Sequence, residues 1–269
     1  MSPITIVKKK ILELLATRGL FLSRCIDVQT LKRLIERMHP RTTRFDLIRV
    51  GGETDGGYLV PDDLEGIVGC FSPGVDVVAS FEAAIVARGI PCFLADASVA
   101  APPISNSLIH FDQKFLGVVD DSLTTTMDTW VKAYAPPTGD LILQMDIEGA
   151  EWPVLLNVSD ETLNRFRIIV LELHSLERLF DQVGFNFIFA SLDRLLRRYH
   201  VVHLHPNNLV SPVQASGLAI PRLLEVTLLR HDRGQPTGYA NRFPHPLDRR
   251  NLPDRRDYVL PECWFRSAN

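Results

Sequence analysis

The sequence predicts an α/β fold in which helices cover both faces of a mostly parallel sheet. Short β-rich runs alternate with helical runs over most of the chain, an order typical of parallel sheets. The runs at 141–145 and 168–173 are almost continuously apolar, as expected for central parallel strands buried on both faces. Because such sheets bind ligands at the carboxyl ends of their strands, a functional cleft is expected there.

Composition narrows the class of protein. The 269 residues are 46% hydrophobic, enough for a packed core, and 32 acidic side chains nearly balance 29 basic ones. This balance excludes the strongly basic surface typical of nucleic-acid binding, so no nucleic-acid partner is expected. The apolar stretches are shorter than the roughly 18 to 20 residues of a transmembrane helix, so no transmembrane segment is predicted. The four scattered cysteines indicate free thiols in a reducing compartment, and we predict a cytoplasmic location.

Residues 1–44 are predicted to be a helical attachment. Ile4, Val7 and Ile11 recur at helical spacing and favour an amphipathic helix that docks on the domain or on a second subunit, which allows a homo-oligomer. Contact with a membrane surface is the alternative. A second helix is expected after Asp27, whose side chain suits an N-cap.

Residues 45–232 are predicted to form one domain, because no repeat or linker divides them. In chain order, the expected elements are strand 45–50, strand 66–71, helix 79–88, strand 90–94, strand 108–111, helix 125–134, strand 141–146, helix 149–156, strand 168–173, helix 176–199, strand 201–204 and strand 223–230. Residues 233–269 are rich in Arg, Pro and Asp and are expected to be an irregular tail that packs on the same domain. The tail's arginines would form local salt bridges or make a surface for an anionic substrate or a partner.

The first candidate site follows strand 66–71. The strand runs into Ser72, Pro73 and Gly74, and a helix containing Glu82 comes next. A small-residue turn between a strand and a helix lets a ligand approach the backbone closely. The signal is weak alone, because no GxGxxG motif is present and Pro73 lacks a backbone donor.

The next strand ends in a second candidate site, Asp96 with Ala97. Asp96 lies 22 positions beyond Gly74, close to the offset of about 20 at which an acid binds the ribose hydroxyls of a nucleotide. The two sites together predict an adenosine-containing cofactor. A helix N-cap is the alternative for Asp96.

Acidic residues also follow strand 141–146. Asp146, Glu148 and Glu151 crowd the end of the strand and the start of a helix. Glu151 has an ordinary explanation in the helix dipole, whereas Asp146 emerges into the expected cleft, where an acid serves a cation, a positively charged ligand or a proton. The following strand ends similarly, in Glu172 and His174.

These residues carry a family resemblance. Thr125–Asp128, then D-I-E-G-A-E at 146–151, then the apolar run into Glu172, resemble the T-L-D, K-x-D-x-E-G-x-E and hydrophobic-E pattern of FkbM-type S-adenosylmethionine-dependent methyltransferases. The resemblance covers roughly residues 45–230. It implies a class I methyltransferase fold with a seven-stranded sheet whose last strand, 223–230, is antiparallel. It also implies O-methylation of a hydroxyl on a sugar, a glycan or a secondary metabolite.

Transferred to this chain, the resemblance implies that Ser72–Gly74 form the first cofactor loop, that Asp96 binds the ribose, and that Asp146 and Glu148 form the motif after the fourth strand. The first loop lacks the usual GxGxG form, and Gln144 replaces a frequent lysine. The glycine-rich segment 51–58 is either a plain hairpin or a loop that closes over the methionine end, with Asp55 near the amino group.

Methyl transfer to an alcohol requires a base, and Asp146 and His174 are the predicted catalytic residues. A neutral imidazole suits proton removal near pH 7, so His174 is the preferred base, with His203 and His205 as competitors. For these two competitors the structural alternative is a strand end with one ring inward and one outward.

An alternative mechanism uses a divalent cation, Mg²⁺ rather than Zn²⁺, held by Asp146 with Glu172, His174 or Asn207. This mechanism ranks below direct base catalysis, because the sequence shows no closed set of ligands.

Two other classes of protein stay open. A nicotinamide-dependent oxidoreductase shares the strand-acid geometry, although it normally carries GxGxxG. A non-catalytic cofactor-binding domain would keep the fold and would not need the cluster of carboxylates. The acceptor is expected to be a small molecule or a glycan, and its identity is beyond the sequence.

Overall fold

A seven-stranded sheet organises the molecule. The computed structural model describes residues 3–19, 23–75 and 77–267. The sheet has the order β11-β14-β10-β9-β4-β5-β6. Its strands are β4 (Ile67–Pro73), β5 (Cys92–Ala95), β6 (Ile109–Asp112), β9 (Asp140–Met145), β10 (Phe166–Leu173), β11 (Tyr199–Pro206) and β14 (Leu224–Arg230). All neighbours are parallel except that β14 is antiparallel to both β10 and β11. The predicted fold class, including the antiparallel last strand, is confirmed.

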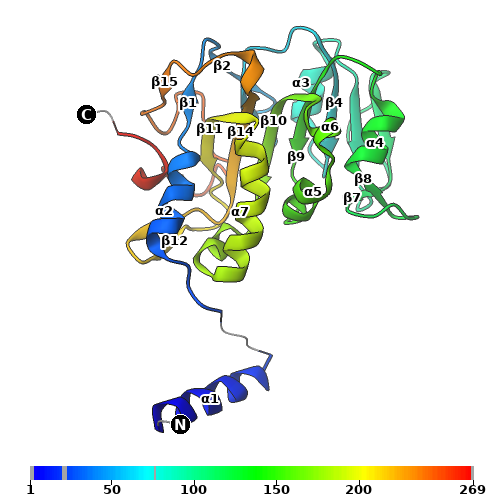
Figure 1. The fold of residues 1–269 in the computed structure, drawn as a ribbon. Helices are drawn as coiled ribbons and strands as arrows, with labels where there is room; N and C mark the ends of the chain where they lie inside the picture. The colour runs from blue at the N-terminus through cyan, green and yellow to red at the C-terminus, as the bar shows by residue number, and fades with distance from the viewer. Residues whose placement is uncertain (1–2, 20–22, 76, 268–269) are drawn as a thin grey trace.

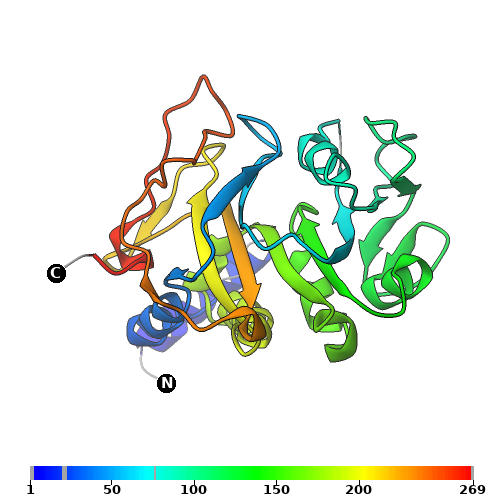
Figure 2. The ribbon, with the colours of Figure 1, turned by 90° about the horizontal axis from the view of Figure 1, so that it is seen from above.

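Each face of the sheet is covered by its own hydrophobic core. Helices α4 (Met127–Tyr134), α5 (Glu151–Asn157), α6 (Asp160–Leu163) and α7 (Gln182–Leu196) pack on one face, where Leu143 and Leu171 point. Helix α3 (Ser80–Val86) and the hairpin of β2 (Leu47–Val50) and β3 (Tyr58–Pro61) cover the other face, against Ile142 and Val170. Figures 1 and 2 show the two layers on opposite sides of the sheet.

Two predicted elements differ from the structure. The strand expected at 45–50 is β2, and it pairs with β3 as a separate antiparallel hairpin. The single helix expected at 176–199 is divided into the 3-10 helix η1 (Leu176–Phe180) and α7. Asp181 separates the two and caps α7, because its carboxylate accepts a hydrogen bond from the backbone nitrogen of Gly184.

Two-stranded pairs complete the β structure. They are β1 (Arg41–Thr42) with β15 (Gly238–Tyr239), β7 (Phe115–Gly117) with β8 (Thr124–Thr126), and β12 (Val213–Ala215) with β13 (Leu218–Ile220). The β7–β8 pair follows β6 in the chain and forms a separate sheet.

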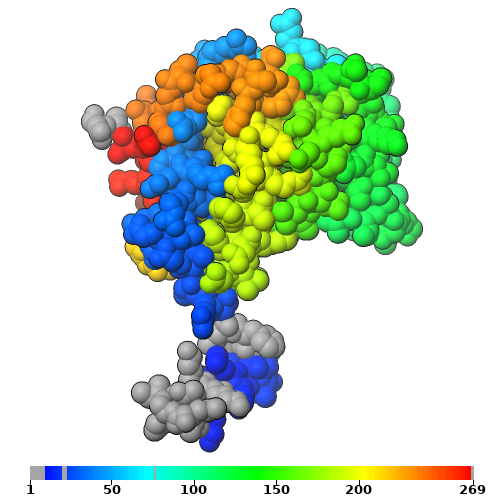
Figure 3. Space-filling view, in the orientation of Figure 1, coloured from blue at the N-terminus to red at the C-terminus, as the bar shows by residue number. Residues whose placement is uncertain are grey.

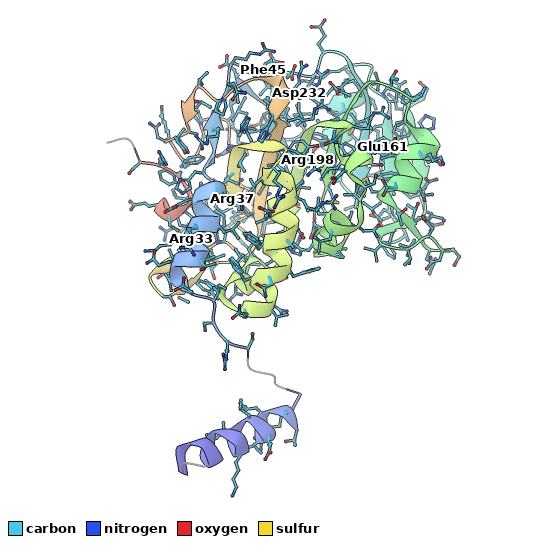
Figure 4. All side chains as sticks on the ribbon, viewed as in Figure 1. Arg33, Arg37, Phe45, Glu161, Arg198 and Asp232 are labelled. Carbon is cyan, nitrogen blue, oxygen red and sulfur yellow. The ribbon has the colours of Figure 1, made fainter. Side chains whose placement is uncertain are left out.

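The two N-terminal helices behave differently. Helix α2 (Val28–Arg37) is capped by Asp27 as predicted, and it buries one face against the domain. Arg37 of α2 forms an ion pair with Asp193 of α7, and Figures 3 and 4 show the two helices side by side. Helix α1 (Pro3–Ala16) lies apart from the domain in Figure 1, with Ile11 and Leu14 exposed. Its docking on a second subunit stays a prediction. No helix in the described residues is long and apolar enough to cross a membrane.

The chain after β14 crosses the molecule as a largely irregular tail. It contains the short 3-10 helices η2 (His231–Arg233) and η3 (Glu262–Trp264). Leu260 and Trp264 are buried in the core, so the tail is held by apolar packing. Two of its arginines form ion pairs with residues far away in the chain, Arg233 with Asp63 and Arg249 with Glu53.

Candidate active site

A cavity of about 390 Å³ opens at the carboxyl ends of β4, β5 and β9, where the sequence predicted a cleft. Its size lies in the range of small-molecule sites. Six residues selected from the sequence line it, namely Asp55, Gly74, Glu82, Asp96, Asp146 and Glu148. Ser72, Pro73 and Ala97 are not among its lining residues, and Ser98 is. The rest of the lining is mainly apolar and includes Phe81, Phe115 and Leu116.

Gly74 explains how the three strand ends come together. Its φ is +81°, and a Cβ at this position would lie 1.7 Å from the carbonyl oxygen of Asp146. Its backbone nitrogen donates a hydrogen bond to the carbonyl oxygen of Ala95, at 3.0 Å. Glycine is therefore required here because the loop after β4 passes directly against the loop after β9.

Ser72 belongs to a buried polar network beneath the cavity. Its hydroxyl contacts Oε1 of Glu82 and, at 2.5 Å, Oε1 of Gln144. One hydroxyl has one proton and cannot donate to both oxygens. Burial raises the pKa of Glu82, although the Ser72 hydrogen bond opposes this rise, and the raised pKa favours the protonated carboxyl group that could supply a second proton. Ser72 thus supports the cavity from below.

Asp96 is held in a fixed orientation at the cavity wall. Its Oδ1 accepts hydrogen bonds from the backbone nitrogen of Ser98, at 2.8 Å, and from the Ser98 hydroxyl, at 2.6 Å. No helix follows β5 before β6 among the described residues, so the N-cap alternative does not apply. A turn of this kind orients a carboxylate without a helix.

The turn between β9 and α5 is organised by Glu151. Glu148 and Gly149 have positive φ angles of 55° and 99°. The fully buried Glu151 accepts hydrogen bonds at Oε1 from the backbone nitrogens of Ile147, at 3.0 Å, and Gly149, at 3.2 Å. Glu151 therefore shapes the turn that presents Asp146 and Glu148 to the cavity.

His174 lies behind Asp146 and is not among the cavity's lining residues. Its Nδ1 is 3.1 Å from Oε1 of Glu151, and its Nε2 is 3.9 Å from Oδ1 of Asp146 and 3.4 Å from Oε2 of Glu148. Burial lowers the pKa of His174, but the hydrogen bond to Glu151 and the surrounding carboxylates raise it above its usual value overall. A raised pKa makes the ring a weaker candidate for a neutral base and a better counter-charge to the acids around it.

Asp146 has the electrostatics of a group that exchanges protons near neutral pH. Burial raises its pKa to about 7, with the charge of His174 opposing the rise and that of Glu148 adding to it. Its Oδ1 is buried and has no hydrogen-bond partner in the described part of the chain. A buried acceptor without a partner is costly in a folded protein and is typical of a functional group.

The same residues could hold a cation. Asp146, Glu148 and His174 each offer one ligand atom within 4.8 Å of the other two. This set differs from the one named in the sequence, because Glu148 replaces Glu172. Glu172 instead accepts a hydrogen bond from Nδ2 of Asn207 at 2.8 Å, so these two candidate ligands bind each other.

The comparisons with known proteins agree with this geometry. Residues 94–200 match the family model of the methyltransferase FkbM domain. This part of the chain is therefore similar to methyltransferase FkbM domains. The match confirms the resemblance read from the sequence, and it supports a methyltransferase. No curated protein matches the chain.

The FkbM match begins in β5 and ends at the start of β11, so it includes Asp96, Asp146, Glu148 and His174. The Asp55 loop and the tail lie outside it. Several residues that line the cavity, among them Asp55, Gly74 and Glu82, therefore lie outside the part of the chain that the family model covers.

His203 and His205 lie just beyond the FkbM match, on β11. Both are buried, His203 with Nε2 2.8 Å from Oδ1 of Asp248 and His205 with Nδ1 3.2 Å from Oε2 of Glu225. The expectation of one inward and one outward ring is wrong, because positions two apart share a strand face and the tail covers that face. Burial lowers the pKa of His205, but the charge of Glu225 raises it to about 9, so His205 is not a neutral base.

Sequence reasoning missed an acidic row beside the FkbM residues. Glu172 and His205 are the cross-strand partners of Glu225 on β14, which places the three side chains in one row across the sheet. Burial raises the pKa of Glu172 well above its usual value, and the charges of Asp146 and Glu225 add to the rise. The available signal was Glu225 itself, an acid near the start of a mostly apolar strand.

Tyr58 was also missed. Its phenol is buried at the cavity wall, and Nε2 of Gln144 donates a hydrogen bond to it at 3.4 Å. Burial raises its pKa well above the usual value, and the charges of Glu172 and Asp146 act in the same direction. Tyr58 thus lies amid the carboxylates at this end of the cavity.

Proposed function

We propose that the protein is an S-adenosylmethionine-dependent O-methyltransferase that acts on a hydroxyl of a sugar, a glycan or a secondary metabolite. The observation that carries the proposal is the placement of Asp96 and of Asp55 with Asp146 in one cavity at the strand ends. In this proposal, Asp96 accepts hydrogen bonds from the ribose hydroxyls. Phe115 and Leu116 contact the adenine, and Asp55 and Asp146 lie toward the methionine end.

Charge favours this cofactor over a nicotinamide dinucleotide. The sulfonium and the ammonium group of S-adenosylmethionine are positive, and Asp55 and Asp146 line the cavity with Glu172 and Glu225 close behind. Carboxylates in a partly buried cavity attract cations and repel anions. A pyrophosphate would meet this repulsion, and the chain lacks the GxGxxG turn that would offset it.

The chemistry required of the chain is positioning and proton removal. S-adenosylmethionine supplies a methyl group activated by its sulfonium. As the new C–O bond forms and the C–S electron pair returns to sulfur, the hydroxyl proton must pass to a base at the cavity wall. Asp146 suits this role, because its pKa of about 7 is close to the optimum for a base at neutral pH. The charge of His174 favours the carboxylate form of Asp146.

A divalent cation on Asp146, Glu148 and His174 is the weaker alternative. Nδ1 of His174 already faces Glu151, and its Nε2 faces the two carboxylates as an ion pair. Since an imidazolium neutralises these acids, a metal ion is not required for that purpose.

The first experiment tests cofactor binding through Asp96. We expect calorimetry to detect S-adenosylhomocysteine binding to the wild type and no NAD binding. Asp96→Asn should weaken S-adenosylhomocysteine about 10- to 100-fold, because a charge-assisted hydrogen bond contributes on the order of 1.5 to 3 kcal/mol.

Asp112→Asn is the matched control for this experiment. Asp112 ends the neighbouring strand β6, its carboxylate accepts a hydrogen bond from the Tyr134 hydroxyl, and it is not among the cavity's lining residues. Equal affinity in the wild type and Asp96→Asn would refute the assignment of Asp96. Failure of the wild type to bind S-adenosylhomocysteine at millimolar concentration would refute the proposed function.

A further inference from the structure

The C-terminal tail reaches the cavity through one buried side chain. Asn251 is 5% exposed, and its Nδ2 donates hydrogen bonds to Oε1 of Glu225, at 2.6 Å, and to Oδ1 of Asp55, at 3.2 Å. Figure 2 shows the loop between β2 and β3 and the tail next to each other above the sheet. A primary amide nitrogen has two hydrogens, so Asn251 can satisfy both carboxylates at once. The orientation of the amide is decided by chemistry, because its oxygen could not face either carboxylate.

Asp55 needs this contact because of its surroundings. It lines the cavity from the glycine-rich loop 51–57, and the charges of Asp146, Glu172 and Glu225 lie around the nearby Tyr58. Like charges in a poorly solvated site repel one another. Among the described residues, Asn251 is the one side chain that donates a hydrogen bond to Asp55. Without Asn251, repulsion would favour loop positions in which Asp55 leaves the cavity.

We propose that Asn251 is a positioning residue that holds Asp55 at the amino-acid end of the cofactor, which makes the tail a part of the cofactor site. The proposal rests on the proposed function. It goes beyond the FkbM match, because Asp55 and Asn251 both lie outside residues 94–200. It predicts a selective effect: loss of Asn251 weakens contacts to the ammonium group of the ligand and spares those to its adenosine part.

The chain offers a matched control for the same two segments. Arg249 of the tail forms an ion pair with Glu53 of the loop at 2.5 Å, and both side chains are exposed. Glu53 does not line the cavity. Exposed ion pairs contribute little to stability. Arg249→Ala therefore removes a tail-to-loop contact without removing the partner of Asp55.

The test compares two ligands that differ in the amino-acid part. Calorimetry would measure S-adenosylhomocysteine and 5′-methylthioadenosine, which lacks that part, with the wild type, Asn251→Leu, Asp55→Ala, the double variant and Arg249→Ala. We expect Asn251→Leu to weaken S-adenosylhomocysteine about tenfold, because a hydrogen bond to a charged group is lost. It should change 5′-methylthioadenosine less than twofold. The double variant should bind as Asp55→Ala does, and Arg249→Ala as the wild type does.

Asn251→Asp is a second variant, which tests the proposal even if Asn251→Leu does not fold. It keeps the shape of the side chain and replaces the donor with a third carboxyl group, so it should weaken S-adenosylhomocysteine at least as much. Unchanged affinity in both Asn251 variants, or an equal loss for the two ligands, would overturn the positioning role. Additive losses in the double variant would overturn it too. If the wild type bound neither ligand, the proposed function would fail and this inference with it.

Discussion

The two sides of the cavity are built in opposite ways. The side formed by the ends of β4 and β5 with β7 is mainly apolar and carries Asp96, fixed by a neighbour two positions away, and Glu82, which is bound to Ser72. The other side gathers Asp55, Asp146 and Glu148, with Glu172 and Glu225 behind them. The first side relies on local turns, whereas the second is held together across the sheet, the hairpin and the tail. The apolar side would favour a neutral aromatic ring of a ligand. The acidic side would favour a cationic group and the reacting atoms.

The largest effect should come from the acidic side. Asp146→Asn removes the proposed base, and we expect turnover to fall about 10²- to 10⁴-fold, far more than the affinity for S-adenosylhomocysteine falls. The wild type should lose activity as pH falls below about 7, because the raised pKa of Asp146 leaves the carboxyl group protonated there. Steady-state kinetics from pH 5.5 to 8.5 would measure both effects.

Asp140→Asn is the control for this variant. Asp140 begins the same strand at the opposite edge of the sheet, where it pairs with Arg167 and Arg230. It should lower stability and leave turnover per folded molecule intact. Full activity in Asp146→Asn would exclude this residue as the base.

The next effect should come from the junction of the two sides. Gly74→Ala places a Cβ against the carbonyl oxygen of Asp146, whereas the Cβ of Gly89→Ala would have no atom within 4 Å. Both glycines have similar positive φ angles, +81° and +77°. The first substitution should therefore cost about 3 kcal/mol or more of unfolding free energy, and the second about 1 kcal/mol. Denaturant titration would separate them, and equal losses would show that the close approach at Gly74 does not matter.

The smallest effect should come from metal removal. Treatment with EDTA should leave turnover within twofold, because the His174 imidazolium already faces Asp146 and Glu148. If EDTA abolished activity and added Mg²⁺ restored it, the metal-independent mechanism would be wrong. The acidic side of the cavity would then bind a divalent cation.

The difference between the two sides of the cavity also explains which site residues could be predicted from the sequence. Asp96 and Asp146 were predictable, because apolar runs mark buried strands and a residue directly after such a strand must emerge at the ligand edge. His174 was identified by the same rule, but its position behind Asp146 depends on how the β9–α5 turn folds around Glu151. The pattern of strands in the sequence predicts the edge of the sheet at which a residue lies. It does not predict whether that residue lines the cavity or lies behind the lining.

The tail and hairpin contacts could not be predicted in this way. Asn251 contacts Asp55 across 196 positions of the chain, and no periodic pattern links the two. Tyr58 was passed over because the hairpin's packing on the sheet, not its own sequence, surrounds the phenol with acids. The antiparallel direction of β14 was implied by the family resemblance. The apolar pattern of residues 223–230 does not indicate in which direction a strand runs.

That direction has a consequence for the order in which the protein is made. Because β14 runs against its neighbours, it ends at Arg230 on the edge of the sheet away from the cavity. The chain must then return roughly 24 Å, the length of seven strand residues, to bring Asn251 back to Glu225. Because Asn251 follows Arg230 in the chain, the ribosome releases every strand of the seven-stranded sheet before it releases the residue that binds Asp55. A nascent chain can build its sheet early, and it completes this site among its last steps.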